Sequence, residues 1–393
     1  MKLFYLANNR LPTEKAHGVQ IAKMCSAFIS AKVDLLLVLP RRQQPSWLKN
    51  IPIHEYYSLP VLIPTRKLFC IDFLLLKSRF RMPDFFGVLA YWIQSFTFAL
   101  SAWFFCFFRK GVFYSRDLFL LLPLVVLHRP CYFEGHSFPQ TKIGRFLYTF
   151  VLSRTRGVIV ITHQLKSLYK ESFHLKDESI LVAHDGVDIN QFLVSDKTNA
   201  RRTLHFPLDH AIIMYTGNLY PWKGVYTLIE SSQHLSCSPY TLYIVGGDKH
   251  DRDFMKLKNF VTRHGFKNIV LTGYIPYRDI PLYLNAADVL VIPNSKKDVM
   301  SATYTSPLKL FEYMASKKPI VASRIPSLCE VLNDNNAFFF EPDDAASLAA
   351  VLDKVFANFQ SALELGKKAH HDVEQYTWEK RASHILGFLS NFL

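Results

Sequence analysis

The sequence lacks the features that would mark a disulfide-stabilised, zinc-binding or disordered protein. Its 393 residues contain only six cysteines, and no two of them form a C-x-x-C pair. Scattered cysteines argue against a zinc site or a disulfide framework and favour a reducing compartment. The chain has no short-period repeat and no low-complexity tract. Half of its residues are hydrophobic and 20% are charged, which is typical of a globular protein with sizeable cores.

Several functional signatures are also missing. No signal peptide is recognisable before the strand-like segment 2–7, so we expect a cytoplasmic protein. The P-loop spacing G-x-x-x-x-G-K-[ST] is absent. The nearest match to a D-x-D metal motif, Asp251-Arg-Asp253, stands at an expected helix start, where an acidic residue more often acts as a cap. We therefore expect no metal site.

Acidic residues are scarce in one half of the chain. Residues 1–190 hold 24 Lys and Arg against 12 Asp and Glu, whereas the remainder holds 22 against 20. A basic half beside a neutral half predicts that the first domain meets something anionic. Nucleic acid, a phospholipid surface and a phosphorylated acceptor all fit this charge. No nucleic-acid-binding motif is recognisable, so we expect no nucleic-acid partner.

The segment Phe85–Phe108 contains no charged residue, is rich in aromatics and is followed by Arg109 and Lys110. A transmembrane helix needs ~20 apolar residues, so length alone would permit a span. The segment also contains four polar residues: Gln94, Ser95, Thr97 and Ser101. Strand-like segments of one sheet lie on both sides of it. This pattern favours a buried helix, or a helix partly pressed into a lipid interface, over a true span.

Short apolar strands alternate with helical stretches throughout, which predicts parallel sheets covered by helices. The strand candidates are residues 2–7, 33–39, 111–114, 130–133, 158–161 and 180–182, then 211–215, 241–245, 269–271, 289–292, 320–321 and 337–339. Helices are expected at 225–233, 252–264, 281–285, 308–315, 345–356 and 378–389. The polar run Ser195–Arg202 is interpreted as a linker. Two doubly wound domains, 1–190 and 191–375, are therefore expected to face each other across a cleft.

The segment Thr216–Gly224 (TGNLYPWKG) follows a predicted strand and precedes a predicted helix. A glycine turn and Lys223 before a helix N-terminus can bind an anion, because free N–H groups and the helix dipole favour phosphate. An ordinary strand–turn–helix connection with a surface lysine is the alternative.

The segment Ser306–Ala315 (SPLKLFEYMA) is the second candidate. Pro307 suits the first turn of a helix, where its missing N–H costs nothing. The N–H groups of Leu308 and Lys309 could then point at phosphate or a sugar hydroxyl. Glu312 follows about one turn later and could accept hydrogen bonds from ribose hydroxyls. A solvated helix face is the alternative for Glu312.

These segments belong to an ordered series of motifs that covers roughly residues 180–393. The series comprises HDGVD at 184–188, GNL at 217–219 with KG at 223–224, IVGG at 244–247, LTGYI at 271–275, AD at 287–288 with PN at 293–294, and SPLKLFEYMA at 306–315. The series resembles family 4 of the retaining glycosyltransferases, which have the GT-B fold. The first domain resembles the family more loosely, through AHGV at 16–19 and FEGH at 133–136. The resemblance implies that residues 376–393 form a helix that crosses back to the first domain.

The resemblance also implies roles for single residues. Lys223 and His136 would be catalytic, with Lys223 on the donor diphosphate and His136 near the sugar and acceptor. Glu312 would hold the ribose, and Tyr274 and Ile275 would lie against the base. Substrate contacts are further implied for Gly18, Gly217, Asn218, Ser306, Pro307, Leu308 and Lys309. Enzymes of this kind use a nucleotide sugar as co-substrate and need no metal or other cofactor, because lysine and helix dipoles can stabilise the leaving diphosphate.

Two positions depart from the family pattern. Asn218 stands where a second diphosphate-binding arginine is common, and Tyr304 stands where the first of two glutamates is common. A non-catalytic nucleotide-sugar-binding protein, and a sugar-nucleotide epimerase or phosphorylase, therefore stay open beside a transferase. For a transferase the expected partners are a nucleotide-sugar donor and a glycan or lipid-linked acceptor in cell-surface polysaccharide or glycolipid synthesis. An anionic membrane surface on the cytoplasmic side is a further candidate partner.

Overall fold

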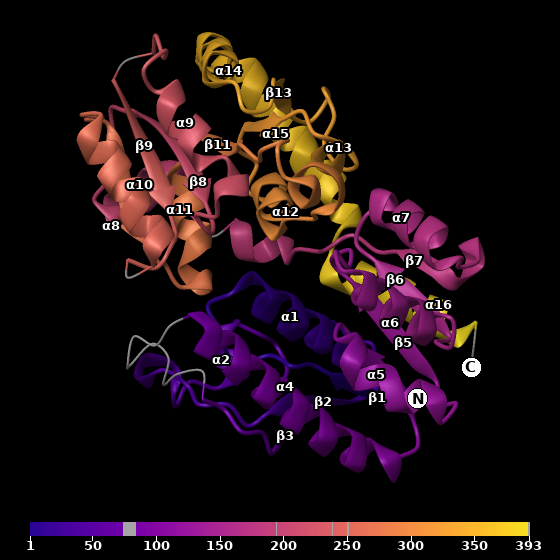
Figure 1. Ribbon diagram of the computed structural model, residues 1–393. Helices are drawn as coiled ribbons and strands as arrows, with labels where there is room; N and C mark the ends of the chain where they lie inside the picture. The colour runs from indigo at the N-terminus through magenta and orange to yellow at the C-terminus, as the bar shows by residue number, and fades with distance from the viewer. Residues whose placement is uncertain (74–83, 194, 238, 250, 392–393) are drawn as a thin grey trace. The chain divides into compact units, whose positions relative to one another are not determined.

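The computed structural model describes all residues except 74–83, 194, 238, 250 and 392–393. The chain forms two compact units (Figure 1). The first consists of Met1–Ala183 and Trp378–Leu393, and the second of His184–Thr377. The C-terminal segment therefore crosses back to the first unit.

The first unit is built on a parallel sheet of seven strands in the order β3-β2-β1-β4-β5-β6-β7. The strands are β1 (Lys2–Leu6), β2 (Asp34–Pro40), β3 (Thr65–Leu68), β4 (Val112–Ser115), β5 (Cys131–Gly135), β6 (Gly157–Val160) and β7 (Ile180–Val182). The residues of β4, β5 and β6 are all buried. Such continuous burial is expected of parallel strands that have helices on both faces.

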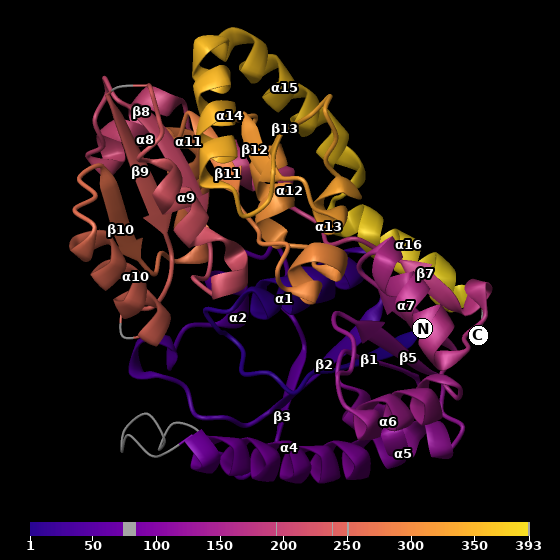
Figure 2. The same ribbon diagram turned by 45° about the horizontal axis from the view of Figure 1, so that its top comes forward.

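The helices of this unit are α1 (Ala16–Ser30), α2 (Ile53–Tyr56), α4 (Asp84–Phe107), α5 (Leu118–Val126), α6 (Lys142–Leu152), α7 (His163–Phe173) and α16 (Trp378–Ser390), with short turns η1 (Ser46–Leu48) and η2 (Asp177–Ser179). The chain first runs from β1 outward to β3 and then from β3 across to β7. Because parallel crossovers are right-handed, the two directions place their helices on opposite faces. Helices α1 and α16 pack together on one face, while α4, α5 and α6 form a layer on the other (Figure 2).

The second unit contains a parallel sheet of six strands in the order β10-β9-β8-β11-β12-β13. The strands are β8 (Ala211–Thr216), β9 (Tyr240–Val245), β10 (Ile269–Gly273), β11 (Val289–Ile292), β12 (Ile320–Ser323) and β13 (Phe338–Phe340). The helices are α8 (Lys197–Leu204), α9 (Val225–Ser231), α10 (Arg252–Arg263), α11 (Ile280–Ala286), α12 (Leu308–Ala315), α13 (Pro326–Cys329), α14 (Ala345–Ala357) and α15 (Phe359–Asp372). Short helical turns complete it: η3 (Ile189–Phe192), η4 (Pro221–Lys223), η5 (Tyr277–Asp279), η6 (Met300–Tyr304) and η7 (Val373–Gln375).

Successive residues of β8 and β11 belong to two separate cores, one on each face of this sheet. Ile212 and Met214 pack into the core that contains residues of α11 and α12. Ile213 and Tyr215 pack into the core that contains residues of α9 and α14. This alternation follows from the period of two in a strand, and it explains why the strands are apolar at every position.

The two doubly wound parallel sheets predicted from the sequence are confirmed. Each predicted strand and helix is present, with ends that differ by at most two residues. The sequence missed β3, the edge strand, because Arg66 and Lys67 at its centre are exposed. Charged, half-exposed residues are typical of edge strands and obscure the apolar pattern. Asp251, expected to act as a cap, stands at the N-cap position of α10, but its side chain makes no capping hydrogen bond with the described residues of that helix.

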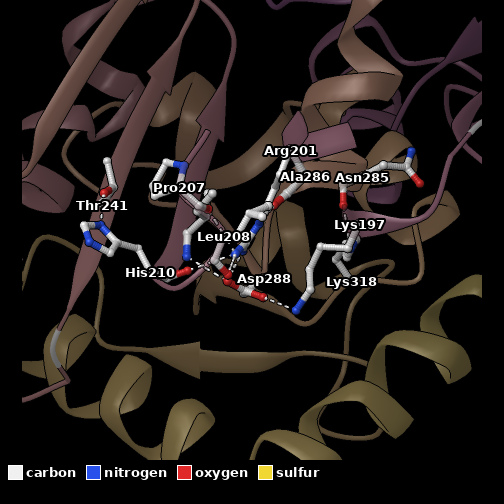
Figure 3. A network of polar contacts seen from close by, with 11 residues as sticks. Lys197, Arg201, Pro207, Leu208, His210, Thr241, Asn285, Ala286, Asp288 and Lys318 are labelled. Atoms are coloured by element: carbon white, nitrogen blue, oxygen red, sulfur yellow. Dashed lines mark hydrogen bonds and ion pairs between the residues drawn. The ribbon is translucent and has the colours of Figure 1, made fainter. Parts of the chain in front are cut away.

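The interpretation of Ser195–Arg202 as a linker is wrong, because most of this run forms helix α8 within the second unit. Asp196 caps the helix by accepting a hydrogen bond from the N–H of Asn199 at 3.0 Å. Arg201 is only 3% exposed and binds Asp288 at the start of β11 (Figure 3). The same carboxylate accepts from Lys197 at 2.9 Å and from the N–H of Ile212 at 2.7 Å. A buried ion pair therefore ties α8 to β8 and β11.

The division between the units falls between Ala183 and His184, earlier in the chain than the expected position after residue 190. The N–H of Val187 donates to the carbonyl of Tyr376 at 2.9 Å, and Val187 pairs with Thr377. This pairing holds the segment after Ala183 in the second unit. It also moves the second division to the peptide between Thr377 and Trp378.

The charge-free segment forms helix α4, and its side chains are mostly exposed rather than buried. Among the described helices, this one is long and apolar enough to cross a bilayer, with a mean hydropathy of 1.4, and 28% of the window is buried. The helix interpretation is confirmed, whereas the interpretation as a fully buried helix is wrong. The reason is that only one stripe of the helix, at Gln94, Phe98, Ala102 and Cys106, meets the rest of the unit.

Candidate functional site

Two lysines are buried at the C-terminal edge of the second sheet. Lys223 is 9% exposed, with its Nζ 3.7 Å from the centre of the Trp222 ring. Lys309 is 7% exposed, with its Nζ 3.6 Å from the centre of the Tyr215 ring. The Lys309 ammonium has no hydrogen-bond partner in the described part of the chain. A buried charged donor without a partner is costly, and an anionic ligand would supply the missing hydrogen bonds.

The electrostatics of the two lysines agree with such a role. Burial lowers the pKa of Lys223 to about 7. Burial, and then the positive charge of Lys223, lower the pKa of Lys309 well below its ordinary value, against a smaller opposite effect of Glu312. Burial is the largest cause of both shifts, and the charge of Glu312 offsets only part of the shift of Lys309. A phosphate group would favour the charged form of both lysines.

The backbone around these lysines is tightly packed. Gly224 has φ = 70°, and a Cβ there would lie 1.7 Å from the carbonyl oxygen of Pro293. A Cβ on Gly246 would lie 2.3 Å from the carbonyl oxygen of Gly217. Only glycine permits these approaches, which bring together the chain segments that follow β8, β9 and β11.

Gly217 lies next to the buried ammonium. A Cβ on Gly217 would stand 3.1 Å from the Nζ of Lys309. The strand end before it is fixed by Tyr313 of α12, whose hydroxyl accepts from the N–H of Thr216 at 2.7 Å. The Tyr215 hydroxyl donates to the carbonyl of Asn218 at 2.5 Å, while the Asn218 residue is exposed. The predicted residues Gly217 and Lys309 are thus brought together by contacts between β8 and α12.

Helix α12 starts where the sequence expected it, with Pro307 at the N-cap position rather than inside the first turn. The Ser306 hydroxyl accepts from the N–H of Asp185 at 3.5 Å. The N–H groups at Leu308 and Lys309 belong to the first turn, at the positive end of the helix dipole. The free N–H groups at this helix end and the buried ammonium of Lys309 therefore belong to the same helical turn.

Glu312 is 7% exposed, so the alternative of a solvated helix face is wrong. Its carboxylate lies against Tyr277 of η5. The pKa of Tyr277 is well above its ordinary value because of burial, then the negative charges of Glu312 and Asp188 and a hydrogen bond with Glu312. The charge of this buried carboxylate acts on Lys309, and its oxygens can accept hydrogen bonds from sugar hydroxyls.

Tyr274 and Ile275 lie directly after β10, two strands away from β8 in the sheet order. Tyr274 is half-buried, and Ile275 packs on the core that contains Leu310 and Phe311 of α12. The structure therefore places both residues at the same edge of the sheet as the lysines. Their role at the base remains a prediction.

Sequence reasoning missed Asn294, which follows β11. Its side chain is fully buried, and neither amide atom has a hydrogen-bond partner within the described residues. The N–H of the next residue, Ser295, donates to the carbonyl of Trp222 at 3.0 Å, which ties this loop to the turn that carries Lys223. Asn294 belongs to the motif series of the sequence, but its burial could not be predicted from the sequence.

In the first unit, His136 follows β5 and contacts a buried carboxylate. Its Nε2 lies 2.8 Å from Oε1 of Glu134, which is completely buried. The same oxygen accepts from Gln20 and from Arg381, each at 2.7 Å, and Oε2 accepts from the Tyr114 hydroxyl at 2.5 Å. Burial alone would raise the pKa of Glu134, but Arg381 and His136 outweigh it and hold that pKa well below its ordinary value.

His136 also lines a cavity of about 490 Å³ in the first unit. Its polar lining includes Asn8, His17 and Arg116, and its apolar lining includes Trp92 and Phe96 of α4. Burial, then nearby basic residues led by Arg116, lower the pKa of His17 to about 3. A cavity of this size with both polar and aromatic lining residues suits a ligand of mixed polarity.

Gly18 was expected on the loop after the first strand, and this expectation is wrong because it lies in the first turn of α1. Its N–H donates to the carbonyl of Lys15 at 2.9 Å. A Cβ on Gly18 would lie 2.2 Å from the Tyr57 hydroxyl and 2.5 Å from a methyl group of Thr13. The missing side chain therefore makes room for Tyr57, and contact with a donor remains a prediction.

Comparison with known proteins finds a family match within the second unit. Residues 210–358, which contain both buried lysines, match the model of the family described as glycosyl transferases group 1. The matched residues include the predicted residues from Gly217 to Glu312. Membership of family 4 specifically remains a prediction.

Relatives and solved structures extend the likeness. The chain is 23% identical over 264 residues to the putative teichuronic acid biosynthesis glycosyltransferase TuaC of Bacillus subtilis, and the match covers 62% of each chain. It is 24% identical over 230 residues to the O-antigen chain mannosyltransferase RfbU of Salmonella typhimurium, over 58% of each chain. The chain therefore spans about three fifths of the length of these relatives.

Anabaena Alr3699/HepE, solved in complex with UDP, superimposes with a TM-score of 0.76 at 18% identity, over all of both chains. This similarity shows that both units have the Rossmann-like α/β architecture of GT-B glycosyltransferases.

Proposed function

We propose that this protein is a retaining glycosyltransferase that moves a sugar from a nucleotide-sugar donor to a hydroxyl of a glycan or lipid-linked acceptor. The buried, unpartnered ammonium of Lys309 next to Lys223 is the observation that carries the proposal. The complexes of Anabaena Alr3699/HepE with UDP and with UDP-glucose support a nucleotide donor. The names of TuaC and RfbU support a role in cell-surface polysaccharide synthesis.

In this proposal the donor diphosphate is held by Lys223, Lys309 and the first turn of α12. Fixed positive groups in a buried site stabilise the charge that develops on the leaving diphosphate, and they need no reorganisation during the reaction. The acceptor hydroxyl attacks from the face that the diphosphate leaves, and a phosphate oxygen takes its proton. This chemistry needs no metal ion and no cofactor beyond the nucleotide sugar.

The other predicted residues complete the site in the proposal. Glu312 accepts hydrogen bonds from the ribose, and Tyr274 and Ile275 lie against the base. Ser306 and the buried amide of Asn294 are candidates for contacts to the sugar or phosphate. His136, in the first unit, acts near the transferred sugar and the acceptor.

Lys309 resolves one of the two departures from the family pattern. Asn218 replaces a common second cation, but the ammonium of Lys309 lies beside Gly217 and can take that place. The second departure, Tyr304, is 3% exposed and lies in η6. An aromatic group in place of a carboxylate changes the contacts with the transferred sugar. We therefore expect the choice of donor sugar to differ from that of members with two glutamates.

Donor binding is tested first by thermal shift with a panel of nucleoside diphosphates and their sugars, starting with UDP and UDP-glucose. One nucleotide should raise the melting temperature of the wild type, and Lys223→Ala should abolish the shift. Lys223→Ala should also lower kcat/KM by ~10²-fold or more, the scale of losing one electrostatic stabiliser. The matched control is Lys318→Ala, because Lys318 is a half-buried lysine of this unit that binds the carbonyl of Asn285 at the opposite sheet edge (Figure 3).

The outcomes separate the competing functions. Near-wild-type transfer by Lys223→Ala would contradict the role of Lys223. Donor binding without transfer to any acceptor would favour a non-catalytic protein or an epimerase, and the epimerase would convert the donor sugar. No stabilisation by any nucleotide would contradict the whole proposal. The cytoplasmic location expected from the sequence remains a prediction.

A further inference from the structure

The first unit exposes an unusual amount of apolar surface on one layer of helices. Helix α4 is exposed along most of its length, with Phe85 at 72% and Phe104 at 73%. Helix α6 adds Ile143 at 76% and Phe146 at 70%. We call this set the aromatic layer: Phe85, Phe86, Val88, Leu89, Tyr91, Trp92, Phe96, Leu100, Phe104, Phe107 and Phe108 from α4 and its end, Val126 and Leu127 from α5 and its end, and Ile143 and Phe146 from α6. Soluble monomers rarely leave so large a set uncovered, so a partner is expected there.

The charge of the same region selects the kind of partner. Residues 85–156 contain eight Lys and Arg but only two acidic residues, Asp117 and Glu134. Glu134 is completely buried and Asp117 is half-buried, so this region exposes no carboxylate. Its exposed basic residues are Arg109, Lys110, Lys142, Arg145, Arg154 and Arg156. An apolar layer with basic residues and no exposed carboxylate is complementary to an anionic lipid surface.

The same charges argue against a second copy of the chain as the partner. Two copies joined through the aromatic layer would bring basic residues to basic residues, with no carboxylate from 85–156 to pair with them. Like charges opposed across an interface disfavour association. An anionic bilayer, by contrast, carries negative charge that can pair with these basic residues.

Helix α4 is attached to the unit in a way that a membrane-spanning helix could not keep. Gln94 donates to the side-chain oxygen of Asn8 at 2.9 Å, and Asn8 donates to Ser95 at 3.0 Å. The Thr97 hydroxyl accepts from the N–H of Ile71 at 3.0 Å. The buried stripe of α4 adds Phe98 and its neighbours to these contacts. Insertion across a bilayer would break all of them, whereas docking on the surface breaks none.

The cavity with His136 adjoins the aromatic layer. Tyr91, Trp92 and Phe96 belong to the layer and also line the cavity. His136 and Arg116 line the same cavity. A molecule with a polar end and an apolar tail could place its polar end beside His136 and its tail along α4.

We propose that the aromatic layer docks on an anionic bilayer, and that the adjoining cavity receives the polar end of a lipid-linked acceptor from that bilayer. The docking stands on the surface of the first unit alone. The choice of a lipid-linked acceptor rests on the proposed transferase function.

Docking is tested by flotation of the full chain with phosphatidylcholine vesicles, with and without phosphatidylglycerol. The chain should bind the anionic vesicles, and binding should weaken at high salt. Phe104→Glu should lower the ratio of bound to free protein ~10-fold or more, because it removes an apolar contact and adds a negative charge. Lys142→Gln and Arg145→Gln should each lower it about fivefold. Met255→Glu is the matched control and should bind like the wild type, because Met255 is an exposed apolar residue of α10 in the second unit.

Three outcomes would overturn the docking proposal. The first is equal binding to vesicles with and without phosphatidylglycerol, or equal binding by wild type and Phe104→Glu. The second is a protein that resists extraction from membranes by alkaline carbonate, which would show a span. The third is a dimer that Phe104→Glu dissociates while no vesicle binds, which would show that a second copy covers the layer.

A transfer assay tests the acceptor and keeps this proposal separate from the transferase function. Phe104→Glu should slow transfer to a lipid-linked acceptor in vesicles and leave transfer to a short-chain, water-soluble analogue unchanged. Its thermal shift with nucleotide should match the wild type. Equal slowing with both acceptors would contradict the proposal. If the wild type binds no nucleotide, the transferase function is contradicted, but the flotation result stays valid.

Discussion

The exposed apolar residues of the two units are distributed in different ways. Among the described residues, fifteen of those in the first unit gather on α4, α5 and α6 and at their ends, whereas the six of the second unit are scattered over separate elements: Leu193, Leu208, Tyr220, Met255, Val270 and Val299. Scattered exposed apolar residues are normal for a soluble protein, whereas a gathered set marks a contact surface. Two copies of one architecture in the same chain therefore present different surfaces to their surroundings.

The two units also differ in whether a buried charged side chain has hydrogen-bond partners. The first unit buries Glu134 and satisfies it with Arg381, Gln20, Tyr114 and His136. The second unit buries Lys309 without a hydrogen-bond partner among the described residues. A satisfied buried charge holds a structure together, while an unsatisfied one needs a ligand. The comparison therefore assigns the anionic ligand to the second unit.

The largest expected effect concerns the buried ion pair of each unit. Arg381→Met should destabilise the first unit by about 3–5 kcal/mol, because it removes the largest compensating charge from the buried carboxylate of Glu134. Arg201→Met should do the same to the second unit through Asp288, which Arg201 binds. Unit-resolved hydrogen exchange should show that each variant weakens its own unit more than the other.

A second variant keeps that test informative. Glu134→Gln combined with Arg381→Met removes both charges and should recover part of the lost stability. Arg381→Met should also leave the nucleotide-induced thermal shift of the second unit in place wherever that unit stays folded. Equal weakening of both units by either single variant would contradict the independence of the two ion pairs.

The next effect is the pH dependence of donor binding in the second unit. Because burial lowers the pKa of Lys223 to about 7, the free protein loses this charge as the pH rises above 7. A bound diphosphate favours the charged form, so affinity for a nucleotide sugar should fall above pH 7, by up to ~10-fold for each pH unit. Calorimetry at several pH values measures this, and the two phosphates of a nucleotide sugar do not themselves titrate in the range.

Lys223→Arg provides the control, since arginine stays charged throughout and should reduce the slope. Without ligand, the free energy of unfolding changes with pH in the opposite direction to the donor affinity. An unfolded chain binds the Lys223 proton up to about pH 10.4, so the stability of the free second unit should rise between pH 7 and that value. A donor affinity that stays constant from pH 7 to pH 9 would contradict a buried, titrating Lys223.

The smallest effect compares one helix cap in each unit. Asp196 caps α8 through the N–H of Asn199, and Thr141 caps α6 through the N–H of Gly144 at 3.0 Å. Asp196→Ala and Thr141→Ala should each cost about 1 kcal/mol in urea unfolding. A measurable cost for Asp196→Ala would confirm that α8 is a folded part of the second unit. No cost at all would instead suit the flexible linker that the sequence first indicated.

The regular part of the fold could be predicted because its signal is local. Strands such as Ile180–Val182 and Val289–Ile292 have the predicted bounds, since parallel strands covered on both faces are apolar at every position. The edge strand β3 and helix α8 were missed for the opposite reason. Their polar residues either face solvent, as Arg66 does, or find a distant partner, as Arg201 does in Asp288.

Residues of the site in the second unit were found from motif order, and their arrangement was not. The sequence named Gly217, Lys223, Lys309 and Glu312, and the structure gathers them at one sheet edge. It placed Gly18 wrongly, because Tyr57 fills the space that a loop glycine would leave for a ligand. Asn294 was missed as a site residue, because an unsatisfied amide has no signature in the sequence.

By itself, the sequence determined the two parallel sheets, the basic first half and the order of the donor-binding motifs, because strand burial, charge and motif spacing are properties of neighbouring residues. Only the tertiary structure decided which charges are satisfied and which apolar residues stay uncovered. The pairing of Glu134 with Arg381 joins residues 247 positions apart. The exposure of α4 likewise depends on which stripe of the helix meets the sheet, because burial and electrostatic compensation are set by contacts between distant segments.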